Sequence, residues 1–255
     1  MWISHLQDKR IGLVTTGSEF HPHQPSLLCI HGSGGQGEEF LPMLERLQEK
    51  ANLAAIDLPG HGQTPGPGFD EVGDYVVWLA GFLEAGPLRP VLLGNSLGGA
   101  IALGIALDHP HLISGLVLWG SGARLKVLPK ILQGLRDDFP ATVEFLAQMA
   151  YAEETDPALK EQGRQAMALT RPEVLLGDYS ACDKFDVMKR LDEIELPCLV
   201  VCGQGDKLTP LKYSQYLADH IKGARLEIVA QAGHLIHQEQ PQAGAAVLAD
   251  FLGSI

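Results

Sequence analysis

Apolar residues along this chain follow two alternating patterns, short continuous runs and longer runs with helical spacing. The short runs contain few polar positions, as is typical of parallel strands that are buried on both faces. They predict strands at residues 26–31, 53–58, 91–94, 116–120, 198–203 and 224–229. The stretch 2–16 is expected to add one or two antiparallel strands at an edge of the sheet.

Amphipathic helices are expected between these strands. One of them ends at Gly86-Pro87, and its apolar face carries Val72, Tyr75, Val76, Leu79, Phe82 and Leu83. Another is expected to begin with Thr209 as N-cap and Pro210 as first helical residue. Its apolar face carries Tyr213, Tyr216 and Leu217, and a last helix near Pro241 buries Val247, Leu248 and Phe251. This alternation predicts an α/β fold, a doubly wound and mostly parallel sheet.

Residues 123–196 contain no convincing strand. Pro140, Pro157 and Pro172 divide this segment at helix-length intervals. Its helical stripes consist of Leu128, Ile131, Leu132 and Leu135, and of Val143, Leu146 and Ala150. We expect a helical cap inserted into a core formed by residues 1–122 and 197–255. The cap is expected to lie over the carboxyl edge of the sheet, where open α/β sheets bind ligands.

Composition and charge narrow the class of protein. The chain has 255 residues, of which 45% are hydrophobic and 20% charged, so it can bury a core and is not a disordered chain. Its net charge of −12 argues against a nucleic-acid partner, because neutralising phosphates needs clustered Lys and Arg. The longest uncharged stretch, 91–107, is too short for an integral membrane segment, and no secretory signal is recognisable. We expect a cytoplasmic protein, a monomer or a homodimer.

Neither a metal nor an organic cofactor is expected. Cys29, Cys182, Cys198 and Cys202 form no CxxC pair and are interpreted as small buried thiols. The His21-Pro22-His23 cluster lacks Cys or carboxylate companions and is interpreted as loop surface. The glycine-rich segment 32–37 lacks the Lys-Ser/Thr ending of a phosphate-binding loop.

The strongest chemical signal is Gly94-Asn95-Ser96-Leu97-Gly98. It directly follows an expected strand and precedes a helical run, which is the context of a nucleophile elbow. Such a turn pushes the serine hydroxyl out above the sheet. Ser96 is therefore the candidate nucleophile.

A serine needs a base to take its proton, and that base needs a carboxylate to orient it. His234 is the candidate base because its loop follows the last expected strand, and His237 is the main competitor. Asp206, just past the preceding strand, is the candidate carboxylate. The chain order of serine, acid and histidine is that of nucleophile-elbow hydrolases.

Other aspartates are expected to have structural roles. Asp57 is interpreted as a turn carboxylate. Asp183 and Asp186 lie where the inserted segment returns to the sheet, and we expect them to hold that junction.

The chain resembles the α/β-hydrolase superfamily, of the small capped serine esterase or lipase-like type, along nearly its whole length. The matching motifs are His31-Gly32-Ser33-Gly34-Gly35, Asp57-Leu58-Pro59-Gly60-His61-Gly62, the elbow, Gly203-x-x-Asp206-x-x-x-Pro210 and Gly233-His234-x-x-His237-x-Glu239-x-Pro241. These motifs are specific for the fold and the catalytic layout but not for the substrate. The resemblance implies an oxyanion hole formed by the backbone N–H groups of Leu97 and Ser33, or of Gly34 if the loop is shifted by one residue.

The expected function is hydrolysis of a carboxylic ester or thioester through an acyl-enzyme. The apolar stripes of the cap suggest a small-molecule substrate with an apolar acyl part. Dehalogenases and epoxide hydrolases of this superfamily carry Asp at the elbow, so Ser96 argues against them. Carbon–carbon hydrolases of vinylogous diketones remain an alternative, although they usually carry Trp where this chain has Leu235. A non-catalytic ligand receptor is the alternative from another class.

Overall fold

The computed structural model describes residues 5–6, 9–16 and 20–255. Its main sheet has seven strands in the order β3-β5-β4-β6-β7-β8-β9. These are β3 (Leu13–Thr16), β4 (Ser26–Ile30), β5 (Asn52–Ile56), β6 (Val91–Asn95), β7 (Gly115–Trp119), β8 (Cys198–Gly203) and β9 (Arg225–Val229). Strand β3 pairs antiparallel with β5, and every other pairing in the sheet is parallel. The prediction of a mostly parallel sheet is confirmed.

The N-terminal segment contributes one strand to this sheet. It is β3, which forms one edge. Two further strands, β1 (His5–Leu6) and β2 (Lys9–Arg10), pair with each other in a separate two-stranded sheet. Residues 2–4 of the expected edge segment lie outside the described residues.

Side chains alternate between two cores along the inner strands, as the strand period of two requires. In β7, Leu116 and Leu118 belong to one hydrophobic cluster and Val117 and Trp119 to the other. Both faces of the sheet are therefore buried, which explains why these strands read as continuous apolar runs.

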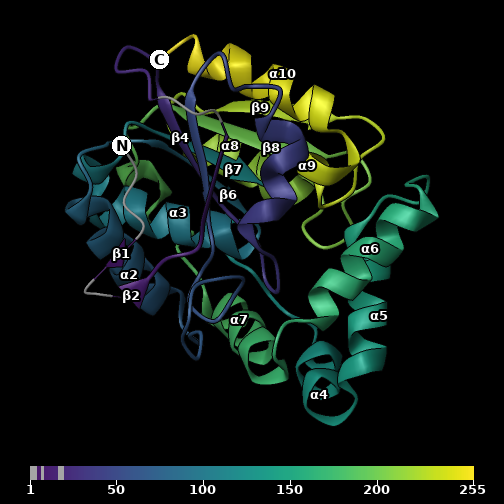
Figure 1. Ribbon diagram of the computed structural model, residues 1–255. Helices are drawn as coiled ribbons and strands as arrows, with labels where there is room; N and C mark the ends of the chain where they lie inside the picture. Colours follow the sequence, from purple (N-terminus) through teal and green to yellow (C-terminus); the bar gives the residue numbers. More distant parts are fainter. Residues whose placement is uncertain (1–4, 7–8, 17–19) are drawn as a thin grey trace.

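Helices cover the two faces of the sheet (Figure 1). Helices α2 (Val72–Ala85), α3 (Leu97–Asp108) and α8 (Leu211–His220) pack on one face. Helices α1 (Leu41–Leu44), α9 (Ile236–Glu239) and α10 (Pro241–Leu252) pack on the other. Short 3₁₀ turns are η1 (Gly37–Phe40), η2 (Pro110–Leu112) and η3 (Leu191–Glu193).

The prediction of Thr209 as the N-cap of α8 is wrong by one residue. Helix α8 begins at Leu211, with Pro210 at the N-cap position. Thr209 instead directs its backbone N–H and its hydroxyl to the carboxylate of Asp206. A hydrogen bond to a residue three positions earlier thus uses the side chain that the helical pattern assigned to the N-cap.

Along the chain, four helices follow β7 and precede β8, within the segment expected to be a cap (Figure 1). They are α4 (Pro129–Asp137), α5 (Phe139–Ala150), α6 (Pro157–Ala168) and α7 (Pro172–Lys184). Each has a proline in its first turn, where the missing N–H costs no hydrogen bond. Helices α4, α5 and α7 form a small hydrophobic cluster, against which Met167 of α6 packs; its buried members are Ile131, Leu135, Val143, Leu146 and Leu175. The boundaries at 123 and 196 stay a prediction.

Across the described ranges, none of the helices combines the length and the apolar character needed to span a membrane.

Candidate active site

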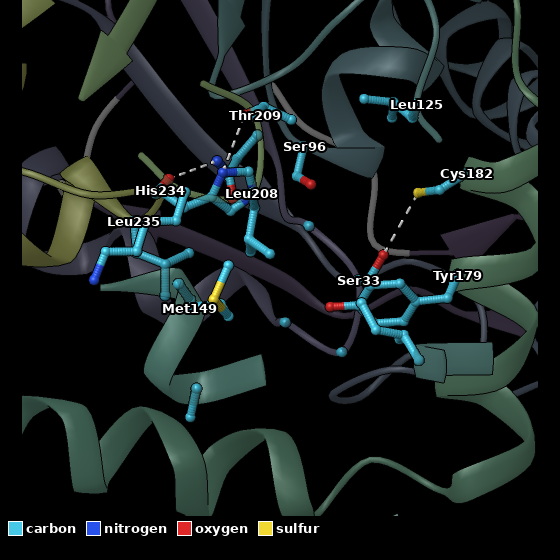
Figure 2. Close-up of a pocket in the computed structure, with 18 of the residues that line it drawn as sticks. Ser33, Ser96, Leu125, Met149, Tyr179, Cys182, Leu208, Thr209, His234 and Leu235 are labelled. Atoms are coloured by element: carbon cyan, nitrogen blue, oxygen red, sulfur yellow. Dashed lines mark hydrogen bonds between the residues drawn. The ribbon is translucent and has the colours of Figure 1, made fainter. Parts of the chain in front are cut away.

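A cavity of about 310 Å³ lies between the carboxyl ends of the parallel strands and the helices α4–α7. Ser33 follows β4, Ser96 follows β6 and His234 follows β9, and all three line this cavity. In Figure 2, His234 and Thr209 are seen on one side of Ser96, and Ser33 and Cys182 on the other. The cavity therefore occupies the position at which open α/β sheets bind ligands.

Ser96 lies in the strained turn that its motif predicts. Its φ of 55° is one of two positive φ values among the described non-glycine residues. Its N–H donates to the carbonyl of Trp119 at 3.0 Å, and Ser121 Oγ donates to its carbonyl at 2.8 Å. These contacts from β7 and the loop after it hold a backbone conformation that is costly by itself.

The two glycines of the elbow are required by close backbone contacts. A Cβ atom on Gly94 would collide with the carbonyl of Gly98, and a Cβ on Gly98 with the carbonyl of Ile30. The strand, the turn and helix α3 can approach one another this closely only without side chains at these positions.

His234 and Asp206 form a buried pair beside Ser96. His234 Nδ1 lies 2.8 Å from Asp206 Oδ2, and the two residues are 4% and 6% exposed. Burial alone would raise the pKa of Asp206. Attraction to His234 and hydrogen bonds from His234 and Thr209 outweigh that effect and hold the pKa of this carboxyl below its usual value. The pair can keep the histidine oriented and stabilise its charged form.

Backbone and amide contacts fix the loop that carries His234. The His234 N–H donates to the carbonyl of Ala150 at the end of α5, at 2.8 Å. Asn95 Nδ2 donates to the carbonyls of both His234 and Trp119, at 3.2 and 3.1 Å. The residue before the candidate nucleophile thus ties the elbow to the histidine loop.

Ser96 and His234 line the same cavity, but the hydroxyl of Ser96 makes no hydrogen bond to a described residue. Such bonds are often long in enzymes without substrate and tighten when substrate binds. The structure thus brings Ser96 and His234 to one cavity and joins His234 directly to Asp206.

The structure distinguishes the two N–H groups considered for the oxyanion loop. The Gly34 N–H donates to Asp178 Oδ2 at 2.9 Å and is thereby occupied. The Ser33 and Leu97 N–H groups have no hydrogen-bond partner among the described residues. Of the two alternatives in this loop, Ser33 alone has an N–H group free to bind substrate.

The other aspartates engage nearby backbone. Asp57 accepts from the N–H groups of Gly37 and Gln63, at 2.7 and 2.8 Å, in agreement with a turn-stabilising role. Asp183 accepts from the N–H of Val127 across the base of the helical segment. Asp186 forms a β-bridge with Arg124 at that junction and an ion pair with it at 3.8 Å.

The competing histidine is directed elsewhere. His237 is 1% exposed, stacks on Phe40 and lies 3.9 Å from Glu39. His31 bonds within its loop, as expected, through Gly32 O, and its Nε2 also accepts from the N–H of Leu58 in the loop after β5.

The structure gives no indication of a metal site at the positions considered. The four cysteines are buried and free, and His21 and His23 are exposed. In the described part of the chain, no group of three or more His, Cys, Asp or Glu residues is arranged to hold a metal ion.

Four residues that support the site were not assigned to it from the sequence. They are Asn95, Thr209, Asp178 and Glu239. Thr209 and Glu239 stand inside or beside motifs that were recognised, so their spacing gave a signal that was not interpreted. Asp178 stands in the middle of an ordinary helical pattern, and nothing local marks it.

The sequence profile of a family described as Alpha/beta hydrolase family matches residues 27–247. The chain belongs to this family. The match covers nearly the whole α/β-hydrolase sheet and every candidate residue of the site. The resemblance stated from the motifs is confirmed.

The chain is similar to two curated relatives and to one solved structure whose names or titles give an activity. A pimeloyl-[acyl-carrier protein] methyl ester esterase of Neisseria meningitidis serogroup C is 32% identical over 244 residues, covering 89% of this chain and 93% of that protein. A putative 2-succinyl-6-hydroxy-2,4-cyclohexadiene-1-carboxylate synthase of Bacillus subtilis is 27% identical, covering 90% and 91%. A structure described as a thermophilic esterase matches with a TM-score of 0.87 at 31% identity, covering 100% of this chain and 97% of that one.

Proposed function

We propose that this chain is a serine hydrolase that cleaves carboxylic esters, thioesters included, through an acyl-enzyme. Ser96 attacks the carbonyl carbon, His234 takes its proton and passes it to the leaving group, and Asp206 orients His234. Water activated by His234 then releases the acyl group. The observation that carries this proposal is the buried His234–Asp206 pair, whose histidine lines the same cavity as a serine held in a strained turn.

The negative charge that develops on the carbonyl oxygen needs donors in place before the reaction. We assign this role to the N–H groups of Leu97 and Ser33. Leu97 is the first residue of α3, so its N–H also lies at the positive end of a helix dipole. The freedom of the Ser33 N–H, with its neighbour occupied by Asp178, supports its choice over Gly34.

The substrate in this proposal is a small-molecule ester with an apolar acyl part. Much of the cavity wall is apolar, and several of these side chains come from residues 123–196, which we propose act as a cap. They include Leu125, Val127, Ile131, Phe145, Met149 and Met167. The name of the Neisseria meningitidis relative makes acyl methyl esters a class to test. The mechanism uses no cofactor. The cytoplasmic location and a monomeric or homodimeric state stay predictions.

The first test is the initial rate with 4-nitrophenyl esters from C2 to C16 and with acyl methyl esters, with Ser96→Ala as the blank. We expect turnover that falls by at least about 10⁴-fold in Ser96→Ala and in His234→Ala. The acyl chain length that gives the highest rate will indicate the size of the part of the cavity that holds the acyl group.

Labelling with a fluorophosphonate separates the alternatives. A folded wild-type protein that labels at Ser96 but hydrolyses no ester would contradict the substrate class and turn the search to diketones. A folded protein that is not labelled at Ser96 and hydrolyses no ester would contradict the proposal that the chain is an enzyme and would favour a ligand receptor.

A further inference from the structure

We propose that Asp178 is a positioning residue for the oxyanion loop, through which the seating of helix α7 on the core sets the rate of the reaction. This inference rests on the proposed function. It concerns a residue that stands 82 positions from Ser96 in the sequence (178 − 96 = 82) and touches neither substrate nor nucleophile.

Asp178 is a fully buried carboxylate in the middle of helix α7. Its two oxygens accept three hydrogen bonds, from Tyr75 Oη at 2.7 Å, His61 Nε2 at 2.9 Å and the Gly34 N–H at 2.9 Å. A buried charge is costly unless it is paired and hydrogen-bonded. All three donors come from outside the helical segment, so the carboxylate joins α7 to the core.

The Gly34 contact falls on the turn that carries the Ser33 N–H. Gly35 donates to the carbonyl of Gly32 at 3.1 Å, which closes a turn over residues 32–35. Gly34 has a φ of +69°, close to what a type II turn requires at its third residue. Type I and type II turns differ in the direction of their central peptide, which here joins Ser33 to Gly34. Because Asp178 accepts the N–H of that peptide, it stabilises the observed direction.

A second contact from the helical segment holds the next peptide. Thr170 Oγ1, in the connection between α6 and α7, donates to the carbonyl of Gly34 at 3.1 Å. There is no room for a side chain at Gly34, because a Cβ would lie 2.6 Å from Leu175 Cδ1. Helix α7 therefore packs directly on the oxyanion loop, and α7 and the connection before it each hydrogen-bond to Gly34.

His61 compensates the charge of Asp178. Its Nε2 faces the carboxylate and its Nδ1 lies 3.2 Å from the carbonyl of Pro59, so both ring nitrogens face acceptors. A bare carboxylate so close to the oxyanion loop would oppose the negative charge of the transition state. Paired with a protonated His61, it can hold the loop without that penalty.

The test compares Asp178→Ala and Thr170→Val with two matched controls. Glu173→Gln removes an exposed carboxylate from the same helix, and Thr142→Val removes a hydroxyl whose one hydrogen bond to a described residue is to the carbonyl of Asp138, the N-cap of α5. For each variant, kcat is expressed per site titrated to completion with a fluorophosphonate, so that unfolded molecules do not count. Hydrogen exchange is measured on the peptide covering residues 31–36.

We expect kcat per site to fall about 10- to 100-fold in Asp178→Ala, with KM nearly unchanged. The reason is that the Ser33 N–H donor is misplaced, whereas the groups that bind the substrate stay in position. Thr170→Val should lower kcat about three- to tenfold, the effect of one hydrogen bond. Exchange in the 31–36 peptide should become faster in both. Asp178→Asn, which keeps one acceptor, should retain more activity than Asp178→Ala.

The inference is wrong if kcat per site in both variants stays within twofold of their controls. If Asp178→Ala yields no titratable sites, Thr170→Val against Thr142→Val decides by the same criterion. Absence of Ser96-dependent turnover in the wild-type protein would overturn the proposed function and this role together. Normal wild-type turnover with unaffected variants would overturn only the role of Asp178.

Discussion

The carboxylate of Asp206 accepts hydrogen bonds from three residues. Besides His234, it binds the N–H groups of Leu208 and Thr209 and the hydroxyl of Thr209, at 2.8 to 2.9 Å. Burial raises the pKa of this carboxyl, but the attraction of His234 and the hydrogen bonds from His234 and Thr209 lower it more. Thr209 also lies 3.2 Å from His234 Nδ1, so one hydroxyl touches both members of the pair.

Replacing Thr209 by Val should therefore lower kcat/KM about tenfold, since a hydrogen bond to a charged group is lost while the shape is kept. Thr209→Ser should restore most of the activity. Steady-state kinetics on the best 4-nitrophenyl ester checks both. Loss of activity in the Ser variant with normal activity in the Val variant would show that the methyl group matters rather than the hydroxyl.

The choice of acid can be tested in the same assay. Asp206→Asn should be severe, whereas Asp57→Asn and Asp183→Asn should act mainly through stability. The outcome that contradicts this assignment is near-normal kcat in Asp206→Asn with loss of activity in one of the other two.

His61 makes the stability of the protein depend on pH. Burial lowers the pKa of His61, but the charge and the hydrogen bond of Asp178 raise it more, so that it lies above its usual value. Because the pKa is higher in the folded than in the unfolded protein, protonation of His61 favours folding. This contribution to stability is complete below the pKa of the unfolded state, about 6.5. That contribution is lost as the pH rises through the folded pKa.

We therefore expect His61→Gln to lower the Tm most at about pH 5 to 6, with a difference that shrinks as the pH rises above about 6.5. Thermal unfolding of both proteins across this range checks it, with the exposed His23→Gln as control. A difference that does not change with pH would show that His61 stabilises by packing alone.

At the scale of elements, the elbow is the place where a strand, a turn and a helix constrain one another. Gly94 belongs to β6 and Gly98 to α3. A Cβ atom on Gly94 would meet the backbone of Gly98, and a Cβ atom on Gly98 would meet the backbone of β4. The local sequence thus encodes a contact between elements, because only glycine permits it.

Gly94→Ala should destabilise the protein by about 3 kcal/mol, since the added methyl group meets backbone that cannot yield easily. It should also slow the labelling of Ser96. Gly73 in α2 provides the matched control, because it is exposed and a Cβ there meets nothing within 4 Å. Gly73→Ala should stabilise by about 0.5 to 1 kcal/mol. Urea unfolding measures both, and equal effects would contradict the argument.

At the scale of the whole molecule, Glu239 joins the histidine loop to the helical segment. Its Oε1 accepts from the N–H of Gly233 at 2.8 Å and from that of Leu235 at 3.3 Å. Its Oε2 accepts from the N–H of Ala152 at 2.8 Å and from the Thr155 hydroxyl. With the contact from Ala150 to His234, the end of α5 thus sets the position of the candidate base.

Glu239→Gln should lower the free energy of unfolding by about 1 to 3 kcal/mol, because an amide NH₂ cannot accept from the donors that one oxygen now holds. It should also lower kcat, since the loop on both sides of His234 loses its support. Glu84→Gln, at an exposed site of α2, is the control. Urea unfolding and kinetics check the two effects, and a stable variant with normal kcat would contradict both.

The sequence by itself determined the elements and the candidate chemistry. Continuous apolar runs predicted the parallel strands to within one or two residues, and Pro140, Pro157 and Pro172 divided residues 123–196 at or next to the starts of α5, α6 and α7. Ser96 was recognisable because the elbow is built from neighbours in sequence. Asp206 and His234 could be chosen because each follows a strand, and the carboxyl ends of parallel strands meet at one edge.

Only the tertiary structure decided how these residues are held. It showed that the Thr209 hydroxyl lies 3.2 Å from His234 Nδ1, 25 residues away in the sequence, and that the Gly34 N–H is occupied, which leaves that of Ser33 free among the described residues. The reason is physical. Periodicity and short motifs record which backbone a segment prefers, whereas the partner of a buried carboxylate such as Asp178 depends on which distant surfaces pack together.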